Sequence, residues 1–212
     1  MKVQIDVWSD YVCPFCYLAE PALERLAEEL PDDVVVSWHA FELRPEPAPT
    51  LDPNGEYLRD IWTRAVYPMA EQRGMTLRLP PLQPRSRLAL EAAEFARAHG
   101  KFNEVNRAIF EAFFEHGADI GDRETLLRIA GDVGINCDAL CEALERGDYR
   151  EGVIADEELA HQLGVSGVPA MLLRYEGEPL EASLEISGAQ PYHLLRSAVD
   201  ELLQRGEVMG DD

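Results

Sequence analysis

Strand-like segments stand near the two ends of this 212-residue chain, and helical patterns fill the sequence between them. Apolar and polar residues alternate over 3–9, and 34–38 is rich in valine, so both segments predict strands. A helical pattern lies between them and ends at Pro31. Strand character returns at 171–173 and 182–187. Because strands must pair, the sequence predicts one α/β domain whose chain is interrupted by a helical insertion.

The central helical part follows a proline-rich loop at 44–53, and its last predicted helix covers 148–163. We expect residues 1–45 and 150–212 to form the α/β domain and residues 46–149 to form an all-helical insertion. Four stripes of apolar residues at helical spacing support this division: Leu88, Ala92 and Phe95; Phe102, Val105, Ile109 and Phe113; Leu126, Ile129, Ala130 and Val133, preceded by Asp122 as N-cap; and Cys137, Leu140, Cys141 and Leu144.

The formal net charge of the chain is −21 at pH 7. A field of this sign repels phosphate, so we expect neither nucleic acid nor a membrane as a partner. The apolar runs are too short to span a bilayer, and the first residues lack the continuous apolar stretch of a secretory signal. We therefore expect a cytoplasmic protein, whose oligomeric state the sequence leaves open.

Two cysteines separated by two residues, Cys13 and Cys16, stand between the first predicted strand and the first predicted helix. The unpaired N–H groups and the dipole of a helix N-terminus favour negative charge, so this position favours the thiolate of Cys13. Pro14 suits the first helical turn, where its missing N–H has no intrahelical partner. Cys16, one turn further on, can attack a disulfide formed on Cys13. The motif therefore predicts thiol–disulfide exchange.

The other two cysteines, Cys137 and Cys141, leave three interpretations open. We favour small buried core residues, because both lie on a stripe with Leu140 and Leu144. Together with the first pair they would instead form a zinc site. A second redox pair is disfavoured, because Cβ vectors in a regular helix converge poorly. We expect no metal site, and we expect the histidines at the surface: His39, His99, His116, His161 and His193.

A second candidate segment, Gly164–Pro169, precedes the predicted strand at 171–173. The residue before a proline is pushed toward extended geometry. A cis bond between Val168 and Pro169 would expose the Val168 backbone for pairing with an extended substrate peptide. Since only about 5–6% of X–Pro bonds are cis, local sequence alone favours the trans form.

Taken together, these motifs match a known family. The chain resembles the DsbA-like thioredoxin-fold proteins, most closely their FrnE-like cytoplasmic branch. The matching segments run nearly from end to end: 9–17 (SDYVCPFCY), 41–45 (FELRP), 120–122 (IGD), 163–169 (LGVSGVP) and 187–192 (SGAQPY).

This resemblance implies a thioredoxin fold of the α/β class interrupted by an all-helical insertion, and a redox-active pair formed by Cys13 and Cys16. It reverses the expectation for Pro169, which it implies to be cis and to face that pair. Substrate is then expected to contact Pro14, Phe15, Val168 and Pro169. The chain departs from relatives at Phe15, where a histidine would stabilise the thiolate, so we expect a less oxidising pair.

A second departure concerns proton transfer. Many thioredoxin-fold enzymes carry a buried acid six residues before the nucleophile, and this chain has Val7 there. We expect Asp6 to point to the opposite face of its strand and Asp10 to lie in the loop. The residue that accepts the proton therefore stays open.

Three functions follow as hypotheses. The leading one is an enzyme that exchanges disulfides with thiol or disulfide proteins, using its own Cys13–Cys16 disulfide rather than a cofactor, with glutathione open as a further partner. The second is a glutathione-dependent isomerase resembling 2-hydroxychromene-2-carboxylate isomerases, which commonly have serine in place of the first cysteine. The third is a non-catalytic zinc-binding or chaperone-like module.

Overall fold

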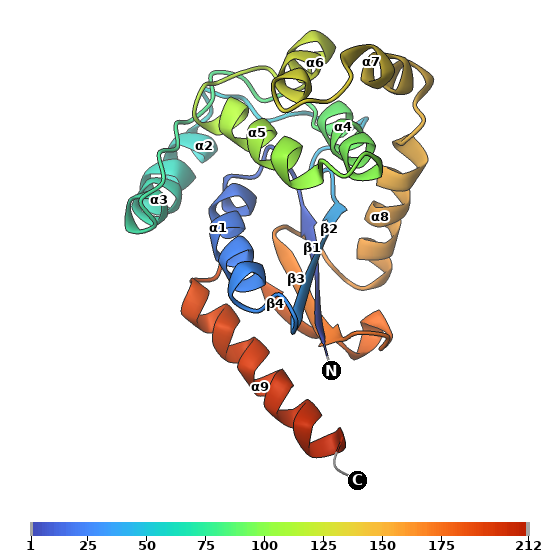
Figure 1. Cartoon of the computed structure of the whole chain (residues 1–212). Helices are drawn as coiled ribbons and strands as arrows, with labels where there is room; N and C mark the ends of the chain where they lie inside the picture. Colours follow the sequence, from blue (N-terminus) through green and yellow to red (C-terminus); the bar gives the residue numbers. More distant parts are fainter. Residues whose placement is uncertain (1, 211–212) are drawn as a thin grey trace.

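The computed structural model describes residues 2–210 and contains one mixed four-stranded sheet (Figure 1). The strand order is β2-β1-β3-β4, with β1 parallel to β2 and β3 antiparallel to both of its neighbours. The strands are β1 (Val3–Ser9), β2 (Val34–Ala40), β3 (Ala170–Tyr175) and β4 (Leu184–Ser187). The interrupted α/β class predicted from the sequence is confirmed.

The two faces of the sheet differ in chemistry, as the alternation in β1 requires. Val3, Ile5 and Val7 are fully buried against α1 (Pro14–Glu29) and α9 (Tyr192–Gly210). Asp6 and Trp8 point to the opposite face, which α8 (Arg150–Gln162) covers. The start of α1 therefore follows a strand that is packed on both sides.

Most of the remaining helices lie beyond the carboxyl ends of β1 and β2 (Figure 1). They share one core with the first turn of α1, including Cys16 and Tyr17. The boundaries at 46 and 149 stay a prediction, and residues 1, 211 and 212 lie outside the described residues. The helices are α2 (Glu56–Ile61), a π-helical turn (Trp62–Val66), α3 (Tyr67–Gln72), α4 (Arg87–Ala98), α5 (Phe102–Phe114), α6 (Arg123–Asp132) and α7 (Cys137–Arg146).

Local caps and turns decide where α6 and β4 begin. The Asp122 carboxylate accepts a 2.9 Å hydrogen bond from Thr125 N–H, which confirms the predicted N-cap of α6. The strand predicted at 182–187 is shorter, because a 3-10 turn (Leu180–Ala182) occupies its first residue.

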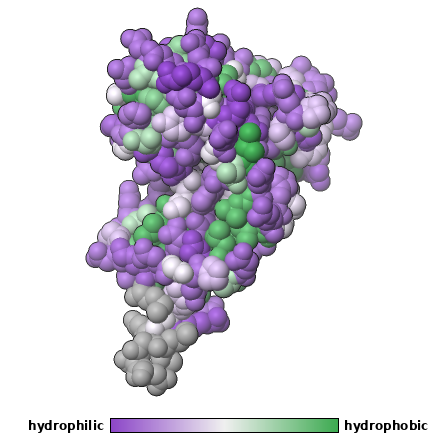
Figure 2. Space-filling model, turned by 90° about the vertical axis from the view of Figure 1, so that its right-hand side faces the viewer, coloured by the Kyte–Doolittle hydropathy of each residue, from purple (hydrophilic) through white to green (hydrophobic). Residues whose placement is uncertain are grey.

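None of the helices described here is long and apolar enough to cross a bilayer. The side that carries α8 is mostly hydrophilic, with small hydrophobic patches (Figure 2).

Candidate active site

Cys13 is the N-cap residue of α1, and Pro14 follows it in the first turn. No side chain closes this cap with a hydrogen bond. The Cys13 carbonyl instead accepts bonds from Cys16 N–H at 3.1 Å and Tyr17 N–H at 3.5 Å. No capping side chain therefore competes with the sulfur of Cys13 for the positive end of the helix dipole.

The segment between α8 and β3 brings its backbone to the same sulfur. Cys13 Sγ lies 3.4 Å from the carbonyl oxygen of Val168, and the Val168–Pro169 peptide bond is cis. Only 5% of Cys13 is exposed, and Cys16 is fully buried. The structure thus gathers Cys13, Cys16, Val168 and Pro169, four of the six residues expected to act at one site.

The two thiols are free and stand in different environments. Burial raises the pKa of Cys16 well above its usual value, and the neighbouring Cys13 raises it further. The Ser9 hydroxyl and the backbone of Asp10 oppose that shift by hydrogen bonding. Cys16 is therefore buried and held as a thiol, whereas Cys13 keeps a small exposed surface.

Asp10 lies in the loop, as expected, but its side chain is completely buried. Its carboxylate accepts bonds from Leu43 N–H at 2.7 Å and Val12 N–H at 3.3 Å. Burial raises the pKa of Asp10 to about 6, against the opposing effects of Ser86 and these N–H groups. Asp10 thereby ties the loop before Cys13 to the segment after β2.

A buried polar chain supports the start of α1 from the side of α5. Tyr11 donates to Asn106 Oδ1 at 2.9 Å, and Asn106 Nδ2 donates to Glu20 Oε1 at 2.6 Å. Burial raises the pKa of Glu20 to about 8, helped by the nearby Glu24. This chain was not foreseen, because its members are far apart in the sequence.

Two hollows flank the contact between Cys13 and Val168. One is a cavity of about 280 Å³ whose wall includes both of these residues together with Pro14 and Phe15. The other, of about 680 Å³, runs past Phe15, Val168 and Pro169. All four residues expected to bind substrate therefore line space beside Cys13.

The prediction that Cys137 and Cys141 are buried core residues is wrong. Cys137 is exposed and Cys141 is half-buried. The buried face of α7 is centred on Leu140, with Ala143 and Leu144, and at about 100° per residue Cys141 falls well to its side. Among residues 2–210, no three His, Cys, Asp or Glu side chains are grouped so as to hold a metal ion.

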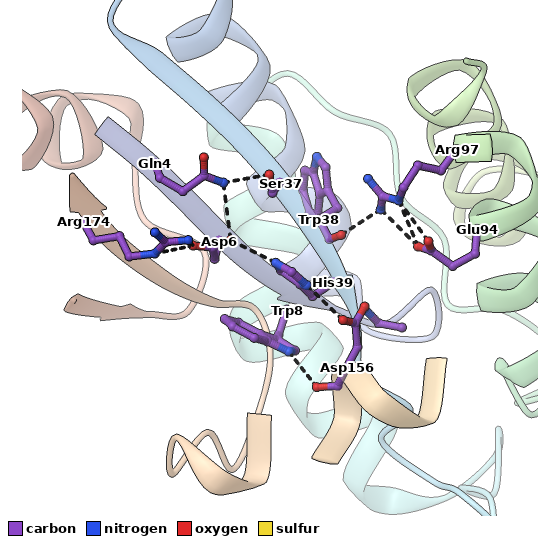
Figure 3. Close-up of polar contacts among 11 residues, drawn as sticks. Gln4, Asp6, Trp8, Ser37, Trp38, His39, Glu94, Arg97, Asp156 and Arg174 are labelled. Carbon is purple, nitrogen blue, oxygen red and sulfur yellow. Dashed lines mark hydrogen bonds and ion pairs between the residues drawn. The ribbon is translucent and has the colours of Figure 1, made fainter. Parts of the chain in front are cut away.

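The surface prediction is also wrong for His39. This ring stacks on Trp8 and bonds Asp6 Oδ1 at 3.0 Å and Asp156 Oδ1 at 3.1 Å, as Figure 3 shows. Burial lowers the pKa of His39, but the two carboxylates outweigh burial and raise it to about 9. Arg174 pairs with Asp6 from β3. Alternation alone could not reveal this partner set, because Asp156 comes from α8.

A family model described as DSBA-like thioredoxin domain matches residues 4–200. The chain belongs to this DsbA-like family. It is 36% identical over 179 residues to "Uncharacterized protein YwbO" of Bacillus subtilis (strain 168), covering 82% of this chain and 88% of that protein. The family and the thioredoxin fold implied by the resemblance are confirmed, and the FrnE-like branch stays a prediction.

One further relative of this DsbA-like chain and one solved structure with a similar fold carry functional names. A 2-hydroxychromene-2-carboxylate isomerase of Sphingobium xenophagum is 28% identical over 182 residues, covering 82% of this chain and 90% of that protein. The structure of the cytosolic disulfide reductase DsbM from Pseudomonas aeruginosa with GSH superposes with a TM-score of 0.71 at 19% identity, covering 95% of this chain and 99% of that one.

Proposed function

We propose that the protein is a thiol–disulfide oxidoreductase in which Cys13 is the nucleophile and Cys16 the resolving cysteine. The contact between Cys13 Sγ and the Val168 carbonyl carries this proposal. It puts the sulfur of Cys13 beside the cis peptide segment Val168–Pro169, at a helix N-terminus that no side chain caps.

In the reductive direction, the Cys13 thiolate attacks a substrate disulfide, and one substrate sulfur leaves as a thiolate. Cys16 then loses its proton and attacks Cys13 Sγ, which forms the Cys13–Cys16 disulfide and releases the second substrate thiol. The reverse sequence donates the disulfide to a dithiol. No cofactor beyond the two cysteines is needed for either direction.

The proposed partners are thiol or disulfide proteins, with glutathione as a small thiol. An extended substrate chain would pair with the backbone of Val168 along the 680 Å³ hollow and contact Phe15 and Pro169. We propose the cytoplasm as its location, where few cysteines at close spacing suit redox chemistry. A relative with the same fold is named cytosolic and was solved with GSH.

The substitution Cys16→Ser tests the roles of the two cysteines. The variant should accumulate a mixed disulfide on Cys13 when it meets intact insulin or oxidised glutathione, because the attack on the disulfide proceeds and the resolution does not. Mass spectrometry under acid quench measures the adduct, and Cys137→Ser is the matched control. A variant that forms no adduct on Cys13, while the wild type forms no Cys13–Cys16 disulfide, would falsify the proposal.

The second candidate is a glutathione-dependent isomerase. Two observations favour it: the 28% identical isomerase relative, and the 280 Å³ cavity that opens beside Cys13. In such an enzyme bound glutathione supplies the thiol. Isomerisation of 2-hydroxychromene-2-carboxylate that needs glutathione and survives Cys16→Ser would establish this activity, whereas insulin reduction would not survive that change.

A further inference from the structure

The cavity beside Cys13 is mostly apolar, and its volume of about 280 Å³ suits a small molecule. Its apolar lining includes Phe15, Leu51 and Ile61, which are half-buried and present part of their surface to the cavity. Trp62 and Phe114 also line it but are almost completely buried by their neighbours. An apolar cavity of about 150 Å³ holds benzene, so 280 Å³ has room for about one substituted ring. A flat apolar group is the occupant that fits such walls.

The same cavity has a cation on its wall. Arg44 is half-buried there, beside Thr50 and Gln83. Within the described chain, the Arg44 guanidinium has no carboxylate partner, although the protein carries 40 acidic residues. Its neighbours Arg85 and Arg87, by contrast, pair with Glu46 and Glu42. An unpaired guanidinium in a strongly acidic chain is placed to bind an anion from outside.

We propose that this cavity binds a small thiol or disulfide whose sulfur carries an aromatic ring with a carboxylate, the ring lying against the half-buried Phe15, Leu51 and Ile61 and the carboxylate on Arg44. The inference rests on the proposed function, because Cys13 lines the same cavity and must bond to the sulfur of this ligand. Protein substrates would use the hollow at Pro169, so the two hollows serve two substrate classes.

The reaction is a two-electron exchange. The Cys13 thiolate attacks one sulfur of the aromatic disulfide, and the other sulfur leaves as an aromatic thiolate. Solvent protonates this thiolate when its pKa is above the pH of the solution. The ring bonded to Cys13 then occupies the cavity. Cys16 releases its proton to solvent and attacks Cys13 Sγ, so the second aromatic thiol leaves and the two cysteines are oxidised to a disulfide.

The test compares four disulfides that vary ring and charge independently. 5,5′-Dithiobis(2-nitrobenzoate) has a ring and a carboxylate, and 4,4′-dithiodipyridine has only a ring. 3,3′-Dithiodipropionate has only the carboxylate, and 2-hydroxyethyl disulfide has neither. Each rate of reaction with the reduced protein is divided by the rate with free glutathione, which removes intrinsic reactivity. The protein carries Cys137→Ser and Cys141→Ser, so that only the first pair reacts.

The normalised rate should be highest for the aromatic carboxylate, by about tenfold over the uncharged ring. Arg44→Gln should remove most of that preference and leave the rate with the uncharged ring within twofold. Arg44→Lys should restore part of it. Arg128→Gln is the matched control, because it removes one exposed positive charge far along the chain on α6 and should leave the preference intact.

Two results would overturn the inference: equal normalised rates for the charged and uncharged rings, or equal losses in Arg44→Gln and Arg128→Gln. An equal loss of insulin reduction in Arg44→Gln would also overturn it, because the cavity would then serve polypeptide. If the proposed function itself is wrong, the result is different: the reduced protein forms no Cys13–Cys16 disulfide with any of the four compounds.

Discussion

Two helices of this protein begin with a cysteine, and the two beginnings are built differently. Asn136 caps α7, where its side chain accepts a 3.0 Å bond from Ala139 N–H, and Cys137 follows at the first helical position. Cys13 is itself the cap of α1, and no side-chain oxygen competes with its sulfur. Cys137 is exposed, whereas only 5% of Cys13 is exposed. Exposure alone therefore does not indicate which cysteine is reactive.

The surroundings of the two helix starts reinforce the difference. Cys13 faces the Val168 carbonyl and shares a core with Cys16 one turn further along. Cys137 Sγ lies 3.3 Å from the Leu127 carbonyl, and its nearest cysteine in sequence, Cys141, is four residues away in a regular helix. Both sulfurs therefore lie near a backbone carbonyl. The difference is that the start of α1 has no side-chain cap and has a buried second cysteine three residues on, whereas Asn136 caps α7.

The largest effect is expected from removing the sulfur of Cys13, with removal of the Cys137 sulfur as the comparison. Cys13→Ser should lower disulfide exchange more than about 100-fold, because the nucleophile is lost. Cys137→Ser should leave it within twofold. Insulin reduction and oxidation of the protein by glutathione measure both variants. Comparable losses in the two variants would break the comparison between the helix starts.

The next largest effect concerns the polar contacts that join β1 and β2 to α8. His39 joins Asp6 of β1 to Asp156 of α8, and Asp156 also accepts from Ala40 N–H at 2.9 Å. Since the pKa of His39 is raised from 6.5 to about 9, its contribution is complete below about pH 6.5. That contribution is lost as the pH rises through 9, and we expect it to be about 3 kcal/mol.

Urea unfolding at pH 6 and pH 9.5 measures this contribution against His39→Gln. The buried Cys16 thiol also lowers stability at high pH, because it ionises more easily in the unfolded chain. The difference between wild type and variant removes that effect. A pH dependence that is identical in the two proteins would show that His39 does not anchor the site.

The sequence was sufficient for features carried by short segments. Alternation in 3–9 and the position of Cys13-Pro14 predicted the strand and the start of the helix. The sequence was insufficient where partners come from distant segments. Cys137 and Cys141 matched an apolar stripe, but the buried face of a ten-residue helix is set by what packs on it. His39 was assigned to the surface, because nothing local shows that Asp156 lies beside it.

The cavity beside Cys13 shows the same limit. Arg44 stands in a segment that matches the family, yet the sequence assigns it no role. The binding role proposed for Arg44 depends on Leu51 and Ile61, which the fold brings to the same cavity as Cys13. The proline-rich start of the loop at 44–53 was the available signal, since it indicates a rigid segment that can hold a side chain against a cavity.

The smallest expected effect tests the closed start of α7. Asn136→Ala removes the cap and should lower the free energy of unfolding by about 1 kcal/mol, while Asn136→Asp keeps an acceptor and should stay close to wild type. Denaturant unfolding measures both variants, and amide hydrogen exchange at Ala139 should quicken in the alanine variant alone. Disulfide exchange should be unchanged, because the proposed reaction uses Cys13 and Cys16 and not Cys137. A fall in exchange that follows the loss of this cap would mean that α7 positions the Cys13 site, and the two helix starts would then have to be treated as one coupled unit.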